Sequence, residues 1–400
     1  MTTVYDYVVV GGGLAGASAV QGIREVDAKG SILLAGEETH LPYDRPPLSK
    51  KLWFGQKTVE EIFLHDRAYY DTHRVTLALD SRVERLDPQE RTITARNGAV
   101  YGYGRLLLAT GARPRRLEIP GGKLDGICYF RTLDDYLRTR GAAAPGKSAV
   151  VVGGGFIGSE LAAALNICKL EVTMVYPSVL LCDRVFPEDL ARAVQQRFRD
   201  KGVRLLVSDK PVSFARQNGK FVTSTERGAS IASDILVVGV GVTPEVELAQ
   251  AGGLEVGNGI VVNEYLESSR AGVYAAGDNA CFPYQALGQA TRIEHWDHAL
   301  NQGRCAGRNM AGAREPYSHQ PYFFSDLFEF GYEATGEVDA RLETFADWQK
   351  ENDTGVIYYL RDGKVRGVMM CNVWDQVEAA RELVRKGAAM KPENLRGLIR

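Results

Sequence analysis

The sequence is poor in cysteine, and its cysteines do not form pairs with a recognisable spacing. Six of them are scattered over 400 residues, and none is separated from another by the two or four residues that metal sites and redox motifs use. They are Cys128, Cys168, Cys182, Cys281, Cys305 and Cys371. This pattern argues against a disulfide scaffold and a zinc ribbon, so we expect no metal site. It predicts reduced cysteines that pack in a core, as in a cytoplasmic protein.

Long apolar runs and excess charge are also missing. No uninterrupted apolar run approaches the ~18 residues that cross a bilayer, so we expect no stable membrane insertion. The formal net charge is −2, which gives no indication of nucleic acid as a partner. The 400 residues nonetheless exceed the usual size of one hydrophobic core, which predicts two or three domains.

A glycine-rich turn follows the first apolar run, residues 8–10. Its G-x-G-x-x-G spacing is the fingerprint of a dinucleotide-binding turn. The first glycine makes the turn, the second lets the backbone approach a pyrophosphate, and the third lets a helix pack on the strand. The helix N-terminus then presents about half a positive charge to the phosphates. The residues of this first cradle are Gly11, Gly13, Leu14, Ala15 and Gly16.

The same pattern returns 142 residues later, after the apolar run 150–152. One glycine motif is weak evidence, because glycine triplets also occur in plain turns. A second strand–glycine–helix copy predicts that the chain binds two dinucleotides and holds them against each other. The residues of this second cradle are Gly153, Gly155, Phe156, Ile157 and Gly158.

The strands that follow the two cradles end differently. Residues 31–35 form the first of them, and Glu37 lies 21 residues beyond Gly16, where an acid binds adenosine ribose hydroxyls. A solvated acid at a strand end is the alternative interpretation. The corresponding strand 171–175 ends in Tyr176 and Pro177 instead of an acid.

Three further apolar strands end in glycine, which lets the backbone approach a ligand closely. The residues at these strand ends are Ala109, Thr110, Gly111, Gly239, Gly241, Gly277 and Asp278. Asp278 can hold a ribityl or pyrophosphate group, or it can cap the helix that follows.

Residues 42–50 form a proline-fixed loop that carries two cations, Arg45 and Lys50. Its prolines exclude a helix interior. A rigid surface loop with solvated charges is one interpretation. The other is a clamp over the pyrophosphate and ring system of a bound flavin.

Together, these motifs resemble the FAD-dependent NAD(P)H:ferredoxin reductases that serve aromatic dioxygenases and monooxygenases. The two glycine fingerprints, the loop 45–50, the Ala-Thr-Gly at 109–111, Glu160 and the Ala-Gly-Asp at 276–278 occur in the family's order. Several segments are similar to the apoptosis-inducing factor group as well. These are 45–54, 153–162, 319–327, 331–334 and 355–362.

The resemblance implies an α/β fold with two Rossmann-like dinucleotide-binding domains of the glutathione-reductase type and a C-terminal α+β domain. The FAD-binding domain is expected to be discontinuous, formed by residues 1–113 and 247–317. Residues 114–246 are expected to bind NAD, and residues 318–400 to form an interface domain.

The resemblance also implies chemistry. Hydride passes from nicotinamide C4 of NADH to flavin N5, and electrons then leave one at a time to a small iron–sulfur protein such as a ferredoxin. Lys50 and Glu160 match family positions that pair beside N5, where a cation stabilises the reduced flavin. Trp296 matches a residue that lines the flavin, and Glu294 and His295 match residues near the nicotinamide. Val83 and Arg131 are further expected FAD contacts.

Some positions differ from the family pattern. Phe324 and Leu327 stand where most ferredoxin reductases have tryptophan and glutamine, on the expected acceptor side. Tyr176 replaces the acid that marks NADH in many relatives, and no arginine pair follows to hold a 2′-phosphate. NADH is therefore expected as the donor, and NADPH stays open.

Three other functions are possible on the same fold. An NADH-sensing flavoprotein, similar to apoptosis-inducing factor, would form a long-lived charge-transfer complex and a homodimer. A quinone reductase would need an amphipathic C-terminal helix for the membrane, but residues 376–400 are mixed in charge. A disulfide reductase would need a redox cysteine in the loop 41–50, which contains none.

Overall fold

The computed structural model describes residues 2–400 and divides into two compact units. The first unit consists of Met1–Asp44, Val59–Arg113 and Thr243–Pro321. The second consists of Arg45–Thr58, Pro114–Val242 and Tyr322–Arg400. The division into three domains stays a prediction.

The first unit is built on a seven-stranded sheet in the order β3-β2-β1-β6-β5-β4, with β18 also paired to β6. Strands β1, β2, β3, β6 and β18 are parallel, whereas β4 and β5 extend the sheet in antiparallel fashion. Their bounds are β1 Thr3–Val10, β2 Ile32–Ala35, β3 Val75–Ala78, β4 Val83–Asp87, β5 Thr92–Ala95, β6 Val100–Leu108 and β18 Val273–Ala275. Residues 7–10 of β1, all of β2 and residues 106–108 of β6 are buried, and these segments consist of apolar residues as expected for a sheet that is covered on both faces.

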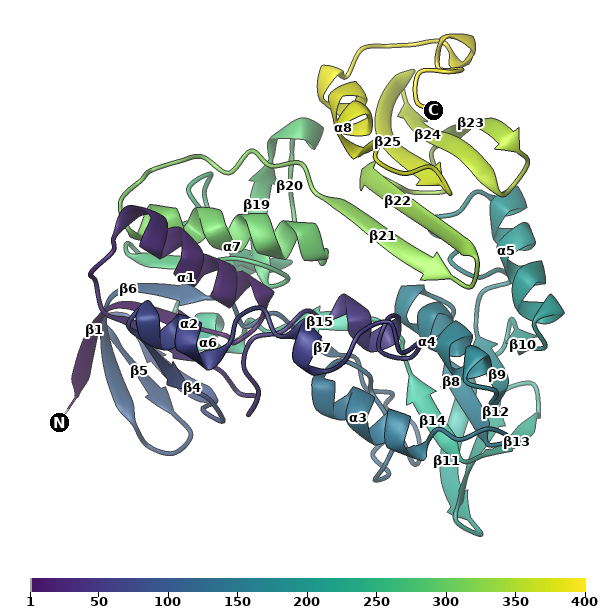
Figure 1. Cartoon of the computed structure of the whole chain (residues 1–400), viewed down its shortest axis with the longest axis horizontal. Coiled ribbons are helices and arrows are strands. Elements are labelled where there is room, and N and C mark those ends of the chain that lie inside the picture. The colour runs from purple at the N-terminus through teal and green to yellow at the C-terminus, as the bar shows by residue number, and fades with distance from the viewer. Residues whose placement is uncertain (1) are drawn as a thin grey trace. The chain divides into compact units, whose positions relative to one another are not determined.

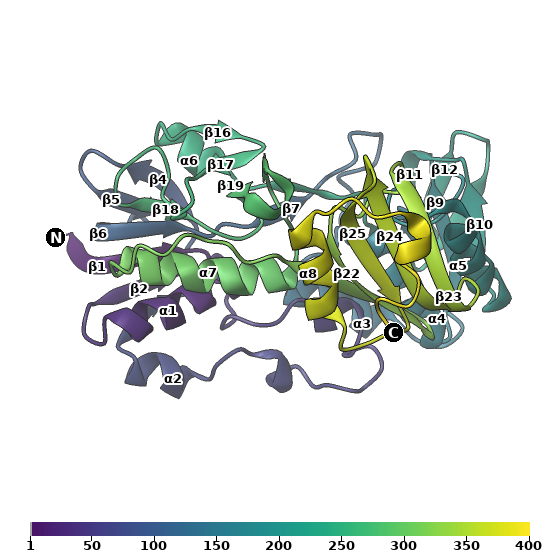
Figure 2. The same cartoon turned by 90° about the horizontal axis from the view of Figure 1, so that it is seen from above.

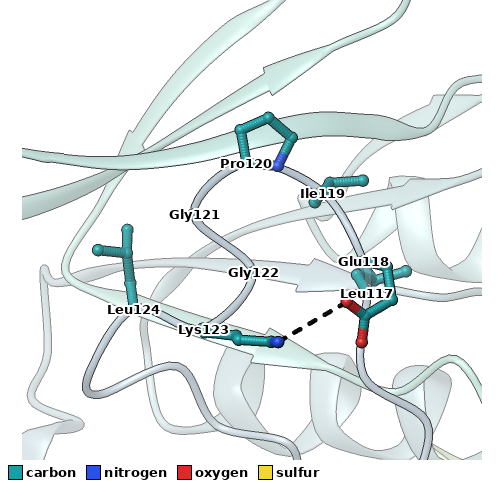
Figure 3. Close-up of a pocket in the computed structure, with 8 residues that line it drawn as sticks. All are labelled: Leu117, Glu118, Ile119, Pro120, Gly121, Gly122, Lys123 and Leu124. Atoms are coloured by element: carbon teal, nitrogen blue, oxygen red, sulfur yellow. Dashed lines mark ion pairs between the residues drawn. The ribbon is translucent and has the colours of Figure 1, made fainter.

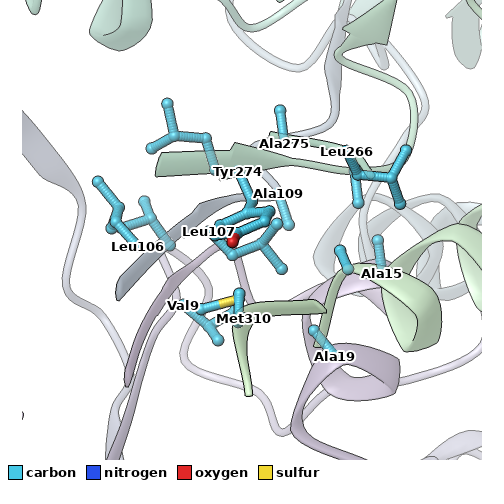
Figure 4. Close-up of a cluster of buried hydrophobic side chains, with 14 of the residues drawn as sticks. Val9, Ala15, Ala19, Leu106, Leu107, Ala109, Leu266, Tyr274, Ala275 and Met310 are labelled. Atoms are coloured by element: carbon cyan, nitrogen blue, oxygen red, sulfur yellow. The ribbon is translucent and has the colours of Figure 1, made fainter. Parts of the chain in front are cut away.

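Two long helices of this unit, α1 (Leu14–Val26) and α7 (Trp296–Met310), lie side by side, as Figures 1 and 2 both show. Glycines allow this close packing. A Cβ on Gly303 would lie 2.2 Å from the Ala15 carbonyl oxygen, and one on Gly22 would lie 2.0 Å from the Arg304 carbonyl oxygen. Side chains from these helices and from β1, β6 and β18 form one apolar core (Figure 4).

Smaller elements complete the first unit. A four-stranded sheet has the order β16-β17-β19-β20. Strands β7 and β15, each of which spans a boundary between the units, pair in a separate two-stranded sheet. The strands are β7 Ala112–Pro114, β15 Val242–Pro244, β16 Val256–Gly257, β17 Gly259–Val261, β19 Ala280–Tyr284 and β20 Gln289–Thr291. The short helices are α2 Arg67–Thr72, α6 Glu247–Ala251, η2 Glu60–Ile62 and η3 Gln285–Leu287.

The second unit contains a parallel sheet in the order β10-β9-β8-β14 and a three-stranded antiparallel sheet, β11-β12-β13. The parallel strands are β8 Ser148–Val152, β9 Glu171–Tyr176, β10 Arg204–Val207 and β14 Ile235–Val238. The antiparallel strands are β11 Pro211–Gln217, β12 Lys220–Thr225 and β13 Ser230–Ser233, and residues 218–219 form the hairpin turn between β11 and β12. The helices are η1 Pro46–Ser49, α3 Leu133–Ala142, α4 Phe156–Ile167 and α5 Glu188–Asp200.

The C-terminal part of the second unit is a five-stranded antiparallel sheet in the order β21-β22-β25-β24-β23, with α8 packed on β22 and β25. The elements are β21 Tyr322–Leu327, β22 Phe330–Gly336, β23 Glu343–Lys350, β24 Thr354–Arg361, β25 Lys364–Cys371, α8 Val377–Lys386 and η4 Pro392–Asn394. Residues 347–355 lie in the hairpin of β23 and β24. The mixed burial of β23 leaves no apolar run that would mark this strand in the sequence.

The two Rossmann-like sheets confirm the predicted α/β fold, since each strand–glycine–helix motif lies at the centre of a parallel sheet. Within residues 2–400, no helix combines the length and the apolar character that crossing a membrane requires.

The glycine contacts between α1 and α7 predict a loss of stability when they are filled. Gly303→Ala should lower the free energy of unfolding by about 1–3 kcal/mol, because the new methyl group overlaps a backbone carbonyl. Gly141→Ala in α3 is the matched control. A Cβ there meets nothing within 4 Å, so this change should be neutral or should stabilise by about 0.5–1 kcal/mol. Urea unfolding measures both, and equal effects of the two changes would contradict the packing argument.

Candidate functional site

The first glycine cradle joins β1 to α1 and leaves open space at the helix N-terminus. Gly11 has φ +124°, and a Cβ there would lie 2.0 Å from the Ala109 carbonyl oxygen. A Cβ on Gly16 would lie 2.0 Å from the Gly11 carbonyl oxygen. At Gly13, the N-cap of α1, a Cβ would meet nothing within 4 Å. The outer two glycines are therefore required by the fold, whereas the middle glycine keeps free the space that a pyrophosphate needs.

The second cradle, between β8 and α4, repeats this geometry in the second unit. Gly153 has φ +117°, and a Cβ there would lie 2.2 Å from the Gly239 carbonyl oxygen. A Cβ on Gly158 would lie 2.2 Å from the Gly153 carbonyl oxygen, and one on Gly155 would meet nothing within 4 Å. The residues present in both cradles therefore fit a dinucleotide at the helix N-terminus.

At the end of β2, the Glu37 carboxylate lies 2.8 Å from the Arg82 guanidinium. This ion pair is exposed, with 59% of the Glu37 side chain accessible, so the carboxylate can still reach a ligand. The predicted ribose contact is compatible with this position and stays a prediction.

Tyr176, at the end of β9, is fully buried. Its hydroxyl donates to the Gln195 side-chain oxygen at 2.8 Å, and a Cβ on Gly154 would lie 2.9 Å from its ring. The Tyr176 ring thus packs directly against the glycine turn at Gly154. A contact with NAD at this position would have to come from the Tyr176 backbone or from the exposed Pro177 that follows.

The strand-end loops of the first unit are held by side chains that sequence reasoning missed. The Thr110 hydroxyl donates to the Glu245 carbonyl at 2.6 Å and accepts from the Asn279 amide at 2.8 Å. The Gly277 amide donates to the side-chain oxygen of Gln302 at 2.8 Å. These bonds fix the loops that carry the predicted FAD contacts Gly111, Gly277 and Asp278. Because the partners are ordinary polar residues without a motif, no sequence signal marks them.

The segment before α7 carries three more predicted residues. The Trp296 indole donates to the Asp44 carboxylate at 2.8 Å, and Glu294 pairs with Arg292 at 2.5 Å. Burial lowers the pKa of His295 to about 4, so its imidazole is neutral at pH 7.

Lys50 and Glu160 form a buried ion pair within the second unit, although 110 residues separate them in the chain. The ammonium nitrogen lies 3.1 Å from Glu160 Oε1, and the two side chains are 7% and 6% exposed. The ammonium also lies 3.4 Å from the Phe324 carbonyl oxygen and 4.5 Å from the centre of the Phe324 ring. Two serines missed by the sequence analysis, Ser49 and Ser325, donate to the Glu160 carboxylate.

The other residues predicted to contact FAD or NAD are distributed over both units. Arg45 donates to the Arg131 carbonyl at 2.7 Å in the second unit. In the same unit, Phe156 packs 5.7 Å from the Phe323 ring, and Ile157 is 40% exposed beside the second cradle. Val83, in the first unit, packs against that unit's core, and Gly241 follows β14 with φ +96°.

A surface hollow of about 570 Å³ lies elsewhere, within the loop 117–124 of the second unit (Figure 3). One exposed ion pair, Glu118–Lys123 at 3.9 Å, crosses it. The hollow contains none of the predicted site residues. Within residues 2–400, no group of three or more histidine, cysteine, aspartate or glutamate side chains could hold a metal ion.

Comparison with known families agrees with this geometry. The family model described as "Pyridine nucleotide-disulphide oxidoreductase" matches residues 5–303, a range that includes both cradles. The chain belongs to this family. A second model, "Apoptosis-inducing factor, mitochondrion-associated, C-term", matches residues 306–354.

Relatives and solved structures extend the likeness over nearly the whole chain. The ferredoxin–NAD(+) reductase component of the anthranilate 1,2-dioxygenase system of Burkholderia cepacia is 33% identical over 394 residues, covering 97% of this chain and 96% of the relative. The putative mitochondrial apoptosis-inducing factor 1 of Drosophila melanogaster is 30% identical over 467 residues, covering 95% of this chain and 63% of the relative. A chain from the covalent putidaredoxin reductase–putidaredoxin complex superposes with a TM-score of 0.91 at 29% identity, covering 97% and 95%.

The buried Lys50–Glu160 pair predicts a strong stability effect. Lys50→Met removes the cation and leaves Glu160 as a buried carboxylate, which should cost about 3–5 kcal/mol of unfolding free energy. The double variant Lys50→Met/Glu160→Gln should recover part of this loss, because no unpaired charge remains. Chemical unfolding of the two single variants and the double variant measures the coupling. Additive effects would show that the two side chains do not interact.

Proposed function

We propose that this chain is an FAD-dependent oxidoreductase that takes hydride from NADH and passes electrons to a small iron–sulfur protein such as a ferredoxin. The main support for this proposal is the pair of cradles. Both have the same close contacts between glycine and a backbone carbonyl, and both leave the N-terminus of the following helix open. The relative from the anthranilate dioxygenase system is named a ferredoxin–NAD(+) reductase, which supports this choice of donor and acceptor.

In this proposal the first cradle holds FAD and the second holds the nicotinamide dinucleotide. FAD, when bound, supplies the step from a two-electron donor to a one-electron acceptor. Gly13 and Gly155 give the two pyrophosphates room at the helix N-termini, and the exposed Glu37 binds the adenosine ribose of FAD. The neutral His295 adds no charge near the nicotinamide.

Lys50 is the proposed electrostatic catalyst, with Glu160 as its partner. An ammonium has three N–H donors, and Glu160 and the Phe324 carbonyl account for two of them. The remaining donor and the positive charge are available to stabilise negative charge on a reduced flavin. Because the pair is buried, water screens this charge only weakly.

A second candidate function rests on the match of residues 306–354 to the apoptosis-inducing factor C-terminal model. In that case NADH reduction would give a stable charge-transfer complex, and dimerisation would be the output. Two further proposals concern the nicotinamide donor and the cellular compartment. NADH is preferred over NADPH, and the six free cysteines support the cytoplasm as the compartment.

The two cradles can be tested separately with one substitution each. Gly13→Val should give a folded but colourless protein, because the side chain fills the FAD pyrophosphate space. Gly155→Val should keep the flavin colour and weaken NADH binding at least tenfold, because only the second cradle is blocked. Absorbance spectra and NADH titration measure both, with circular dichroism as the folding control. If Gly155→Val loses flavin and keeps its NADH affinity, the assignment of the cradles is wrong.

The acceptor can be tested by stopped-flow reduction with NADH, followed by mixing with a ferredoxin or with oxygen. Rapid reoxidation by ferredoxin is expected of the reductase. A slow, air-stable species with a changed oligomeric state would support the sensing function. Lys50→Met should keep FAD and slow hydride transfer about 100-fold. A wild-type reduction rate in this variant would remove Lys50 from the mechanism.

A further inference from the structure

Both oxygens of the Glu160 carboxylate accept a hydroxyl hydrogen bond. Ser49 donates to Oε2 at 2.6 Å, and Ser325 donates to Oε1 at 2.5 Å. Lys50 reaches the same Oε1 at 3.1 Å. The two serines are 4% and 2% exposed, so water does not compete for these bonds.

The hydrogen bonds from Ser49 and Ser325 to Glu160 are short. O–H···O⁻ bonds to an ionised acceptor measure about 2.5–2.7 Å, shorter than bonds between neutral groups. Both serine contacts fall in this range. The two hydroxyls donate to different oxygens of the carboxylate.

Three remote segments supply this arrangement within the second unit. Ser49 ends η1 directly before Lys50, Glu160 lies in α4, and Ser325 lies in β21 one residue after Phe324. Ser49 is therefore the neighbour of Lys50 itself, and Ser325 is the neighbour of Phe324, whose carbonyl contacts the Lys50 ammonium. A carboxylate held at both oxygens cannot rotate about its terminal bond, so its attraction for the ammonium has a fixed direction.

We propose that Ser49 and Ser325 are positioning residues that fix Glu160 and, through it, the ammonium of Lys50. This inference rests on the proposed function, in which Lys50 acts electrostatically on the bound flavin. The serines do not touch the cofactor in this proposal. They determine where the lysine charge stands, and a displacement of that charge by even 1 Å lowers the rate of a preorganised step.

The test uses Ser49→Ala, Ser325→Ala and their double variant in the FAD-loaded full chain. Each single change should slow NADH-dependent flavin reduction about tenfold, and the double change should slow it further. The NADH dissociation constant and the FAD content should stay at wild-type values. Ser325→Thr keeps the hydroxyl and should restore most of the rate. Ser233→Ala is the matched control, because this buried serine of β13 has no hydrogen-bond partner in the described chain.

A second readout is independent of turnover. Ser325→Ala should lower the urea midpoint in the wild-type chain, and this shift should be at least halved in a Glu160→Ala background. Wild-type reduction rates in both serine variants, or the same midpoint shift in both backgrounds, would overturn the inference. The flavin reduction rate of Lys50→Met and Glu160→Gln distinguishes failure of this inference from failure of the proposed function. If NADH reduces the flavin of these two variants at the wild-type rate as well, the proposed role of the Lys50–Glu160 pair is wrong.

Discussion

A close contact between glycine and a backbone carbonyl oxygen determines where both cradles can form. At Gly11 and at Gly153, a Cβ would lie within about 2 Å of a carbonyl oxygen at the end of the neighbouring strand. This contact brings the turn against β6 in one unit and against β14 in the other. The helix that follows then starts at the carboxyl end of a parallel sheet, where its N-terminal N–H groups remain available for phosphate.

The buried Lys50–Glu160 pair is the main electrostatic feature of the predicted site in the second unit. Isolated buried ions are costly, and this pair is compensated by two serine hydroxyls and by the Phe324 carbonyl and ring. The Lys50 ammonium lies in a surrounding of low dielectric constant, where its electric field is only weakly screened. A cation of this kind is what a reaction that builds negative charge on a cofactor requires.

The family's description refers to disulphide chemistry, but this chain does not have the thiols for it. All six cysteines are free, and the loop 41–50 contains none. Cys182, whose backbone amide donates to the Gly154 carbonyl at 2.9 Å, has a buried thiol, and burial raises its pKa to about 12. Such a thiol packs and does not act as a nucleophile. In the function proposed above, the Lys50–Glu160 pair stands in place of the redox cysteine that a disulfide reductase would use.

The sequence by itself determined the two cradles and most of the parallel strands. Glycine spacing and apolar runs are local signals, and the predicted strands 31–35 and 171–175 agree with β2 and β9 to within one residue at each end. The β23 strand was missed because its mixed burial leaves no apolar run. Only the tertiary structure showed that Tyr176 is turned toward Gln195 and that Ser49 and Ser325 hold Glu160. Those contacts join positions far apart in the chain, and a hydroxyl's partner is decided by packing, which a local pattern does not encode.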